Sequence, residues 1–160
     1  IGIGTTFIFT IVFENDLEKT NEIIKNIKVD LSTGQILKVL VVEDNKINQT
    51  ITKKIIEKHN CYCFIVDDGY QALDVLDKEV FDVILMDINM PLISGFETTR
   101  KIRLKGIQTP IIALTAFAKD EITEEAIDAG MNDIMIKPFE PLKLFHVIND
   151  QIKKSKNAVN

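Results

Sequence analysis

The sequence has few cysteines, no long hydrophobic run and no excess of basic residues. Its two cysteines, Cys61 and Cys63, lie two residues apart in one apolar segment. A strand would point them to opposite faces, so we expect no disulfide between them and no disulfide-stabilised scaffold. No apolar run reaches the length of a membrane span, because Glu14 and Asp16 end the longest one. A formal net charge of -5 argues against nucleic acid as a partner.

The first 36 residues differ in pattern from the rest of the chain. Residues 1–13 (IGIGTTFIFTIVF) are apolar and β-branched after a glycine-rich start, which predicts a strand. Residues 14–36 are polar and predict a linker or a weakly amphipathic helix. The sequence starts without Met and without a basic n-region, so we expect residues 1–13 not to be a signal peptide and Ile1 to be the cut end of a longer polypeptide.

From residue 37 onward, short apolar runs alternate with helical patterns. Apolar residues recur at helical spacing between the runs, as at Ile47, Ile51 and Ile55. Ser94 and Glu97 match a capping box, and Gly130 is typical of a helix end. The last helix is expected over residues 141–153. The predicted strands are residues 37–42, 61–66, 83–86, 111–114 and 134–136.

Five β–α units in series, with strands that are apolar on both faces, predict an α/β fold. Its sheet would be parallel and five-stranded, with helices covering both faces. Open sheets of this kind bind ligands beyond the carboxyl ends of their strands.

Polar side chains follow four of the five predicted strands at that edge. Glu43 and Asp44 follow the first strand, Asp87 the third, Thr115 the fourth and Lys137 the fifth. Acidic residues at strand ends are common because loops are polar, so Glu43 and Asp44 alone would predict little. The agreement of all five positions predicts a single site.

Three neighbouring carboxylates raise one another's pKa unless a cation offsets them, and hard oxygen ligands suit Mg²⁺. We therefore expect Glu43, Asp44 and Asp87 to hold Mg²⁺. Asn89, two residues past Asp87, is placed to offer its backbone carbonyl to the metal and its side chain to the approach path.

The same groups can transfer a phosphoryl group to a carboxylate. Asp87 is the expected nucleophile because it ends the middle strand of the predicted sheet. Lys137 carries a flexible point charge and Thr115 a hydroxyl, and we expect both to contact the transferred group.

Residues 37 to about 152 resemble a response-regulator receiver domain of two-component signalling. The motifs that carry the resemblance are VVEDN (41–45), LMDINMPLISG (85–95), ALTA (113–116) and KPF (137–139). The resemblance implies a flavodoxin-like (CheY-like) fold with strand order 2-1-3-4-5. It also implies Mg²⁺-dependent transfer from phosphohistidine to Asp87, followed by hydrolysis of the acyl phosphate. The domain would thus promote its own phosphorylation and dephosphorylation without a kinase active site.

One position departs from the family pattern. Receivers commonly carry an aromatic residue three positions before the lysine, where this chain has Ile134. We therefore expect no aromatic switch at that position. Thr115 can still move toward a phosphate, with the rearrangement being smaller or carried by Phe117 and backbone shifts.

Residues 1–13 resemble the last glycine-rich box and following strand of a histidine-kinase ATP-binding domain, and the fragment is expected not to bind ATP. Their place before a receiver predicts the C-terminal part of a hybrid sensor histidine kinase. The expected divisions are a kinase remnant (1–13), a linker (14–36), a receiver (37–153) and a tail (154–160). Expected partners are a phosphohistidine domain of a kinase, in cis or in trans, and a histidine phosphotransfer protein. The expected location is the cytoplasm, and a membrane-anchored parent protein is compatible with it.

Two other functions compete with this interpretation. A phosphorylation-gated interaction module would share the site but would not pass the phosphoryl group from Asp87 to a partner histidine. A haloacid-dehalogenase-like phosphatase also forms an aspartyl phosphate, but it would carry an aspartate where this chain has Asn89, and it needs a longer chain.

Overall fold

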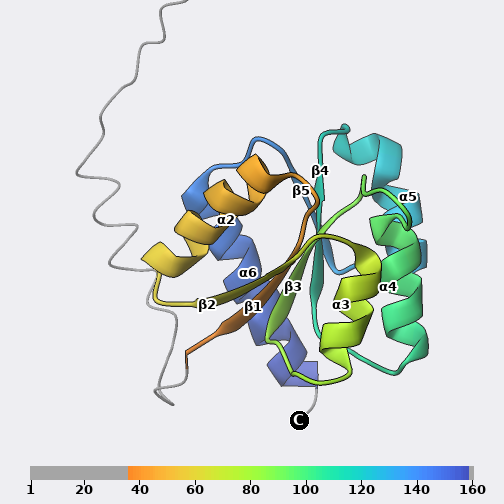
Figure 1. The fold of residues 1–160 in the computed structure, drawn as a ribbon, viewed down its shortest axis with the longest axis horizontal. Coiled ribbons are helices and arrows are strands. Elements are labelled where there is room, and N and C mark those ends of the chain that lie inside the picture. Colours follow the sequence, from red (N-terminus) through yellow and green to blue (C-terminus); the bar gives the residue numbers. More distant parts are fainter. Residues whose placement is uncertain (1–35, 159–160) are drawn as a thin grey trace, which may run out of the picture. The chain divides into compact units, whose positions relative to one another are not determined.

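A computed structural model describes residues 36–158, in which strands and helices alternate (Figure 1). The predictions for residues 1–13 and for nearly all of the 14–36 linker lie outside the described residues. The five predicted strands are present within a residue or two of their expected bounds. The elements are β1 (Lys38–Val42), α2 (Lys46–Lys58), β2 (Tyr62–Val66), α3 (Gly69–Leu76), β3 (Val83–Asp87), α4 (Gly95–Leu104), β4 (Ile111–Thr115), α5 (Lys119–Ala129), β5 (Asp133–Ile136) and α6 (Pro141–Ala158).

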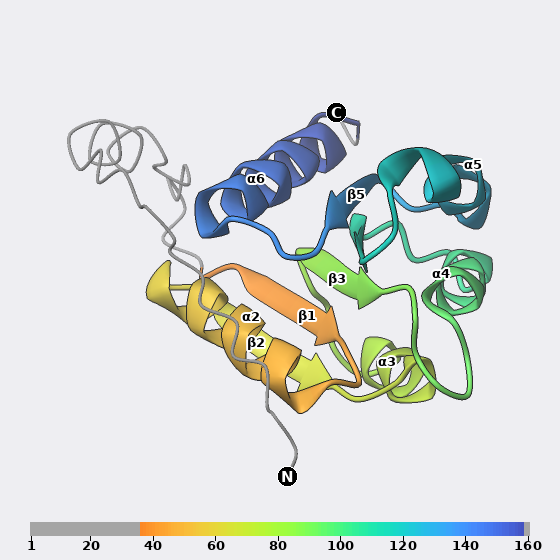
Figure 2. The same ribbon diagram turned by 90° about the horizontal axis from the view of Figure 1, so that it is seen from above.

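The strands form one parallel sheet in the order β2-β1-β3-β4-β5, as predicted. Figure 2 shows α2 and α6 on one face of the sheet and α3, α4 and α5 on the other. In the register of the sheet, Val42 of β1 pairs with Met86 of β3, and Asp87 pairs with Leu114 of β4. The residues that follow these strands therefore lie side by side at one edge.

Burial of the sheet on both faces explains its near-continuous apolar sequences. Every residue of β3 and β4 is buried, including the polar ends Asp87 and Thr115. On α6, the predicted inward residues Leu144 and Ile148 are fully buried. The helix extends past the predicted end at Lys153 to Ala158.

Two predicted helix boundaries are confirmed. The Ser94 hydroxyl accepts a hydrogen bond from the Glu97 N–H at 3.2 Å and caps α4. Gly130 ends α5 with φ of +92°, a left-handed conformation that favours glycine. Gly95 begins α4 directly against β3, where an added Cβ would overlap the carbonyl oxygen of Asp87.

Two of the three residues in the apolar stripe on α2 do not face the sheet, and the third, Ile55, is half-buried. Ile47 and Ile51 are 70% and 52% exposed, whereas the buried residues of this helix are Gln49, Thr52 and Ile56. Each residue turns a helix by about 100°, so the side that carries Thr52 and Ile56 lies well away from the stripe. Packing on the sheet, rather than the most apolar side, determined the orientation of this helix.

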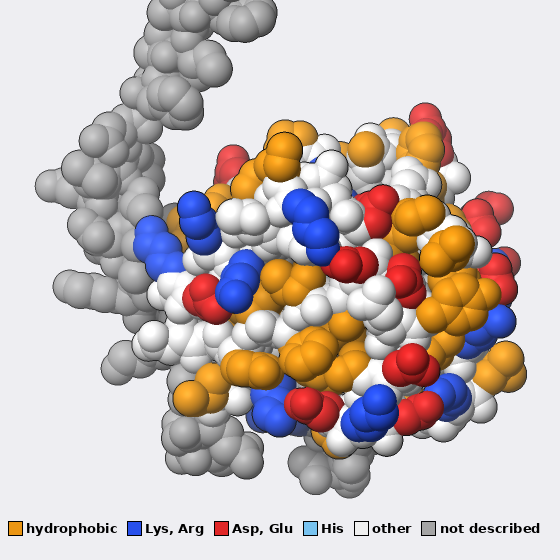
Figure 3. Space-filling model, viewed as in Figure 1, with side chains coloured by type: hydrophobic (Ala, Val, Ile, Leu, Met, Phe, Trp, Pro, Cys, Tyr) orange, Lys and Arg blue, Asp and Glu red, His pale blue; other side chains and the backbone are white. Residues whose placement is uncertain are grey.

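The expectation of no disulfide between the two cysteines is confirmed. Cys61 and Cys63 are both free thiols. None of the helices from α2 to α6 is long and apolar enough to cross a membrane. On the face shown in Figure 3, apolar side chains alternate with charged groups of both signs.

Candidate functional site

Strands β1 and β3 bring the three predicted acidic residues together. Glu43 and Asp44 follow β1, Asp87 ends β3, and one oxygen from each side chain lies within 4.8 Å of the others. Glu43 is 1% exposed and Asp87 is 6% exposed, while Asp44 is exposed. Two carboxylates of the cluster are thus buried, and the third faces solvent.

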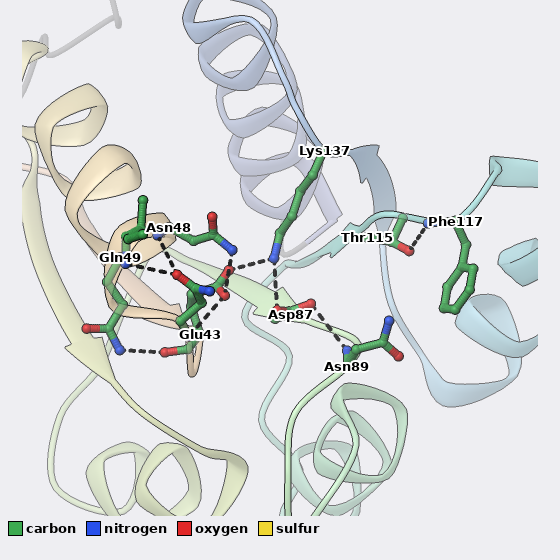
Figure 4. Close-up of polar contacts among 10 residues, drawn as sticks. Glu43, Asn48, Gln49, Asp87, Asn89, Thr115, Phe117 and Lys137 are labelled. Atoms are coloured by element: carbon green, nitrogen blue, oxygen red, sulfur yellow. Dashed lines mark hydrogen bonds and ion pairs between the residues drawn. The ribbon is translucent and has the colours of Figure 1, made fainter. Parts of the chain in front are cut away.

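Lys137, which follows β5, reaches this cluster from two strands away (Figure 4). Its Nζ lies 2.5 Å from Glu43 Oε2 and 2.8 Å from Asp87 Oδ2. The side chain is 19% exposed, so its charge is only partly screened by water. The ammonium group therefore offsets two of the three carboxylates.

The Asp87 carboxyl is held in an environment that disfavours its charge. Burial raises its pKa above the ordinary value, and the Glu43 carboxylate raises it further. The Lys137 ammonium lowers the same pKa, as does the Asn89 N–H, which donates to Asp87 Oδ1 at 3.2 Å. The net effect is a raised pKa of Asp87, so a further cation at the cluster would stabilise the ionised carboxylate.

Thr115 lies apart from the Asp87–Lys137 pair (Figure 4). Its hydroxyl oxygen accepts a hydrogen bond from the Phe117 N–H at 3.0 Å, which leaves the hydroxyl proton available for donation. Phe117 itself is 46% exposed. Ile134, at the position where receivers commonly carry an aromatic residue, is half-buried on β5 against the core.

The first turn of α2 contributes two residues that the sequence patterns did not indicate. Asn48 Nδ2 donates to Glu43 Oε1 at 3.0 Å. Gln49 Nε2 donates to the Glu43 carbonyl at 2.5 Å and to Asp67 Oδ1 at 2.7 Å. Both amides belong to a helix that begins directly after the acidic pair, and this adjacency is the signal that could have identified them.

The donor set of the cluster consists of carboxylate oxygens, which are the ligands that Mg²⁺ prefers. Mg²⁺ binds through a few carboxylates while retaining waters or phosphate oxygens. The exposure of Asp44 leaves room for such additional ligands. The residues present therefore fit this ion.

Comparisons with known proteins agree with this geometry. Residues 39–149 match the response regulator receiver domain family model. The autoinducer 2 sensor kinase/phosphatase LuxQ of Vibrio vulnificus is 40% identical over 143 residues, which cover 88% of this chain and 17% of LuxQ. The hybrid signal transduction histidine kinase I of Dictyostelium discoideum is 40% identical over 137 residues, which cover 79% of this chain and 8% of that kinase. The chain therefore spans less than a fifth of the length of these relatives.

A solved structure provides a closely similar fold. The receiver domain of a sensor histidine kinase from Pseudomonas aeruginosa, crystallised with a magnesium ion in its active-site cleft, is 36% identical with a TM-score of 0.69. The similarity covers 74% of this chain and 99% of that domain. Together with the family match, it favours a receiver over the dehalogenase-like alternative. The chain belongs to the response regulator receiver domain family of two-component signalling.

Proposed function

We propose that this receiver domain accepts a phosphoryl group from a phosphohistidine onto Asp87 in a Mg²⁺-dependent reaction. The observation that carries the proposal is the position of Asp87. It ends the central strand, has Lys137 Nζ at 2.8 Å, and shares a 4.8 Å cluster with two further carboxylates. A nucleophile, a cation and a metal-binding set thus meet at the carboxyl edge of the sheet.

Glu43, Asp44 and Asp87 would hold the metal, with the Asn89 backbone carbonyl as a further ligand. Bound there, Mg²⁺ supplies positive charge that offsets the charge on the phosphoryl oxygens. The ionised form of Asp87, which burial disfavours, would be stabilised in the same way.

In the transfer step, an Asp87 carboxylate oxygen attacks the phosphorus of the phosphohistidine. The phosphorus–nitrogen bond breaks, and its electron pair stays with the departing imidazole, so an acyl phosphate forms on Asp87. Lys137 redirects its Nζ from Asp87 Oδ2 to a phosphoryl oxygen, and the Thr115 hydroxyl donates to another. Attack of water on phosphorus later releases phosphate and restores the carboxylate.

We further propose that residues 37–153 are the receiver of a hybrid sensor histidine kinase, with residues 1–13 as a kinase remnant and 14–36 as a linker. The names and lengths of the two curated relatives support this origin. The phosphoryl donor would be a kinase phosphohistidine domain, in cis or in trans, on the cytoplasmic side of the parent protein. Phospho-Asp87 would then pass the group to a histidine phosphotransfer protein or regulate the parent kinase.

The test is phosphorylation of the full chain with acetyl phosphate. We expect acid-labile phosphate to appear only with Mg²⁺, and Asp87→Asn to abolish it. Asp74→Asn, on the exposed side of α3, is the matched control and should label as the wild type does. Labelling of the Asp87→Asn variant at the normal rate would contradict the proposal. A relay assay with phosphotransfer proteins then separates onward transfer from a phosphorylation-gated interaction module.

A further inference from the structure

The buried carboxylate of Glu43 is held by donors on both of its oxygens. Lys137 Nζ contacts Oε2 at 2.5 Å. On the other side, Oε1 accepts from Asn48 Nδ2 at 3.0 Å and from the Asn45 N–H at 3.3 Å. Because Glu43 is 1% exposed, these donors replace water as the groups that satisfy and orient its charge.

Lys137 divides its contact between Glu43 and Asp87, whereas the donors to Glu43 Oε1 are not shared with Asp87. The same ammonium group lies 2.8 Å from Asp87, so a phosphoryl group there would draw it away from Glu43. Within the described residues, the Asn48 amide donates to no acidic group other than Glu43.

Asn48 is itself well anchored. It belongs to the first turn of α2, where the Asn45 side chain accepts hydrogen bonds from its N–H at 3.2 Å and from the Ile47 N–H at 2.9 Å. This cap fixes the helix start directly beside the acidic pair. The backbone that carries the Asn48 amide is therefore held beside the acidic pair.

We propose that Asn48 is a positioning residue for the metal site: its amide holds Glu43 Oε1 so that Oε2 stays directed into the acidic cluster when Lys137 turns to the phosphoryl group. The inference rests on the proposed Mg²⁺-dependent function and extends it to a residue outside the acidic cluster. Hydrogen-bond partners of metal-site residues commonly control metal affinity in this way.

The primary experiment is a calorimetric titration of Mg²⁺ into the full chain and into Asn48→Ala. Asn48 is half-buried and alanine is a good helix former, so the variant should fold, which circular dichroism checks. We expect the Kd for Mg²⁺ to rise about tenfold. The Mg²⁺ concentration that gives half-maximal labelling by acetyl phosphate should rise by the same factor. The maximal labelling rate should stay within about twofold of wild type. An unchanged Kd overturns the inference.

Two further variants test whether Asn48 acts through Glu43. In a Glu43→Gln background, adding Asn48→Ala should change the Kd by less than about twofold, because the charge that Asn48 orients is gone. If Asn48→Ala weakens Mg²⁺ binding in the Glu43→Gln background as much as it does in the wild type, the inference is contradicted. Thr50→Ala is the matched control: this exposed residue of α2 donates only to the Lys46 carbonyl, at 2.8 Å. The Kd of Thr50→Ala for Mg²⁺ should equal that of the wild type. If Thr50→Ala weakens Mg²⁺ binding as much as Asn48→Ala does, the role of Asn48 is overturned.

The outcomes also separate this inference from the proposed function. Absence of Mg²⁺ binding to the wild-type chain overturns both. Normal binding to the wild type together with an unchanged Asn48→Ala variant overturns the role of Asn48 alone.

Discussion

Replacing Asp87 by Asn should make the metal-free domain more stable near neutral pH. Burial and the Glu43 carboxylate raise the pKa of Asp87, so the folded domain disfavours the ionised carboxylate relative to the unfolded chain. Asparagine has nearly the same shape as the protonated carboxyl and carries no charge. Removal of the proposed phospho-acceptor is therefore expected to increase the free energy of unfolding.

The magnitude follows from the surroundings of the carboxylate. The Asp87 side chain is 9% exposed, and the cluster places ligand oxygens of the three acids within 4.8 Å of one another. Two like charges at that separation repel by roughly 3 kcal/mol at an effective dielectric constant of about 20. The attraction of Lys137 opposes this repulsion but is shared with Glu43. We expect a net gain in the free energy of unfolding for Asp87→Asn that is smaller than this repulsion, because Lys137 keeps Glu43 as its partner when the Asp87 charge is removed.

The pH dependence gives the sign of the effect. Below the ordinary carboxyl pKa of 3.8, Asp87 is protonated in both the folded and the unfolded wild type, and the two proteins should be similarly stable. As the pH rises through the raised folded-state pKa, the folded wild type must lose a proton that it holds more tightly than the unfolded chain does. The wild type then loses stability relative to Asp87→Asn, and the difference persists at neutral pH.

Urea unfolding followed by far-UV circular dichroism, in EDTA between pH 4 and pH 8, measures this difference. The exposed control Asp74→Asn should stay within about 0.5 kcal/mol of wild type. Adding Mg²⁺ at about 100 times its Kd should stabilise the wild type by about 2.7 kcal/mol and Asp87→Asn by less. A variant less stable than wild type at pH 7 in EDTA, or a difference independent of pH, would refute the reasoning.

Three other substitutions have defined outcomes. Lys137→Ala should retain the fold but lose about 3 kcal/mol of stability at pH 7 in urea titrations, because two buried carboxylates lose their ammonium partner. The same variant should transfer phosphoryl groups poorly, and full relay activity would count against its role. Gly95→Ala should cost about 1–3 kcal/mol, because the new Cβ would overlap the Asp87 carbonyl oxygen; thermal unfolding checks this. Asn132→Ala should cost about 2 kcal/mol by the same method, because Asn132 Oδ1 accepts hydrogen bonds from Arg103 Nη2 at 2.9 Å and from the Ile111 N–H of β4 at 2.8 Å, and both donors lose this acceptor.

The sequence predicted the sheet and two helix boundaries well because these depend on local chemistry. Strands buried on both faces need continuous apolar runs, and the Ser94 cap and the left-handed Gly130 are properties of single residues and their neighbours. The orientation of α2 was less predictable. Its most regular apolar stripe, with Ile47 and Ile51, is exposed, because packing against the sheet uses other residues of the helix.

The gathering of Glu43, Asp44 and Asp87 could be predicted because parallel strands end at one edge. The details within the site depend on side-chain rotamers, which sequence patterns do not specify. These details include the Lys137 bridge between two carboxylates, the bond between Thr115 and the Phe117 amide, and the Asn48 amide on Glu43. The expectation drawn from Ile134, that the rearrangement is smaller or is carried by Phe117 and backbone shifts, stays a prediction. Matched structures with and without a phosphate mimic would test it.

The most direct test of phosphoryl acceptance at Asp87 is chemical identification of the modified residue. The full chain is incubated with acetyl phosphate and Mg²⁺, any acyl phosphate is trapped by reduction with sodium borohydride, and the peptides are analysed by mass spectrometry. We predict that the reduced residue is at position 87 and that the product is absent when EDTA replaces Mg²⁺. Modification at Asp44 or Glu43 instead, or labelling that does not need Mg²⁺, would contradict the account.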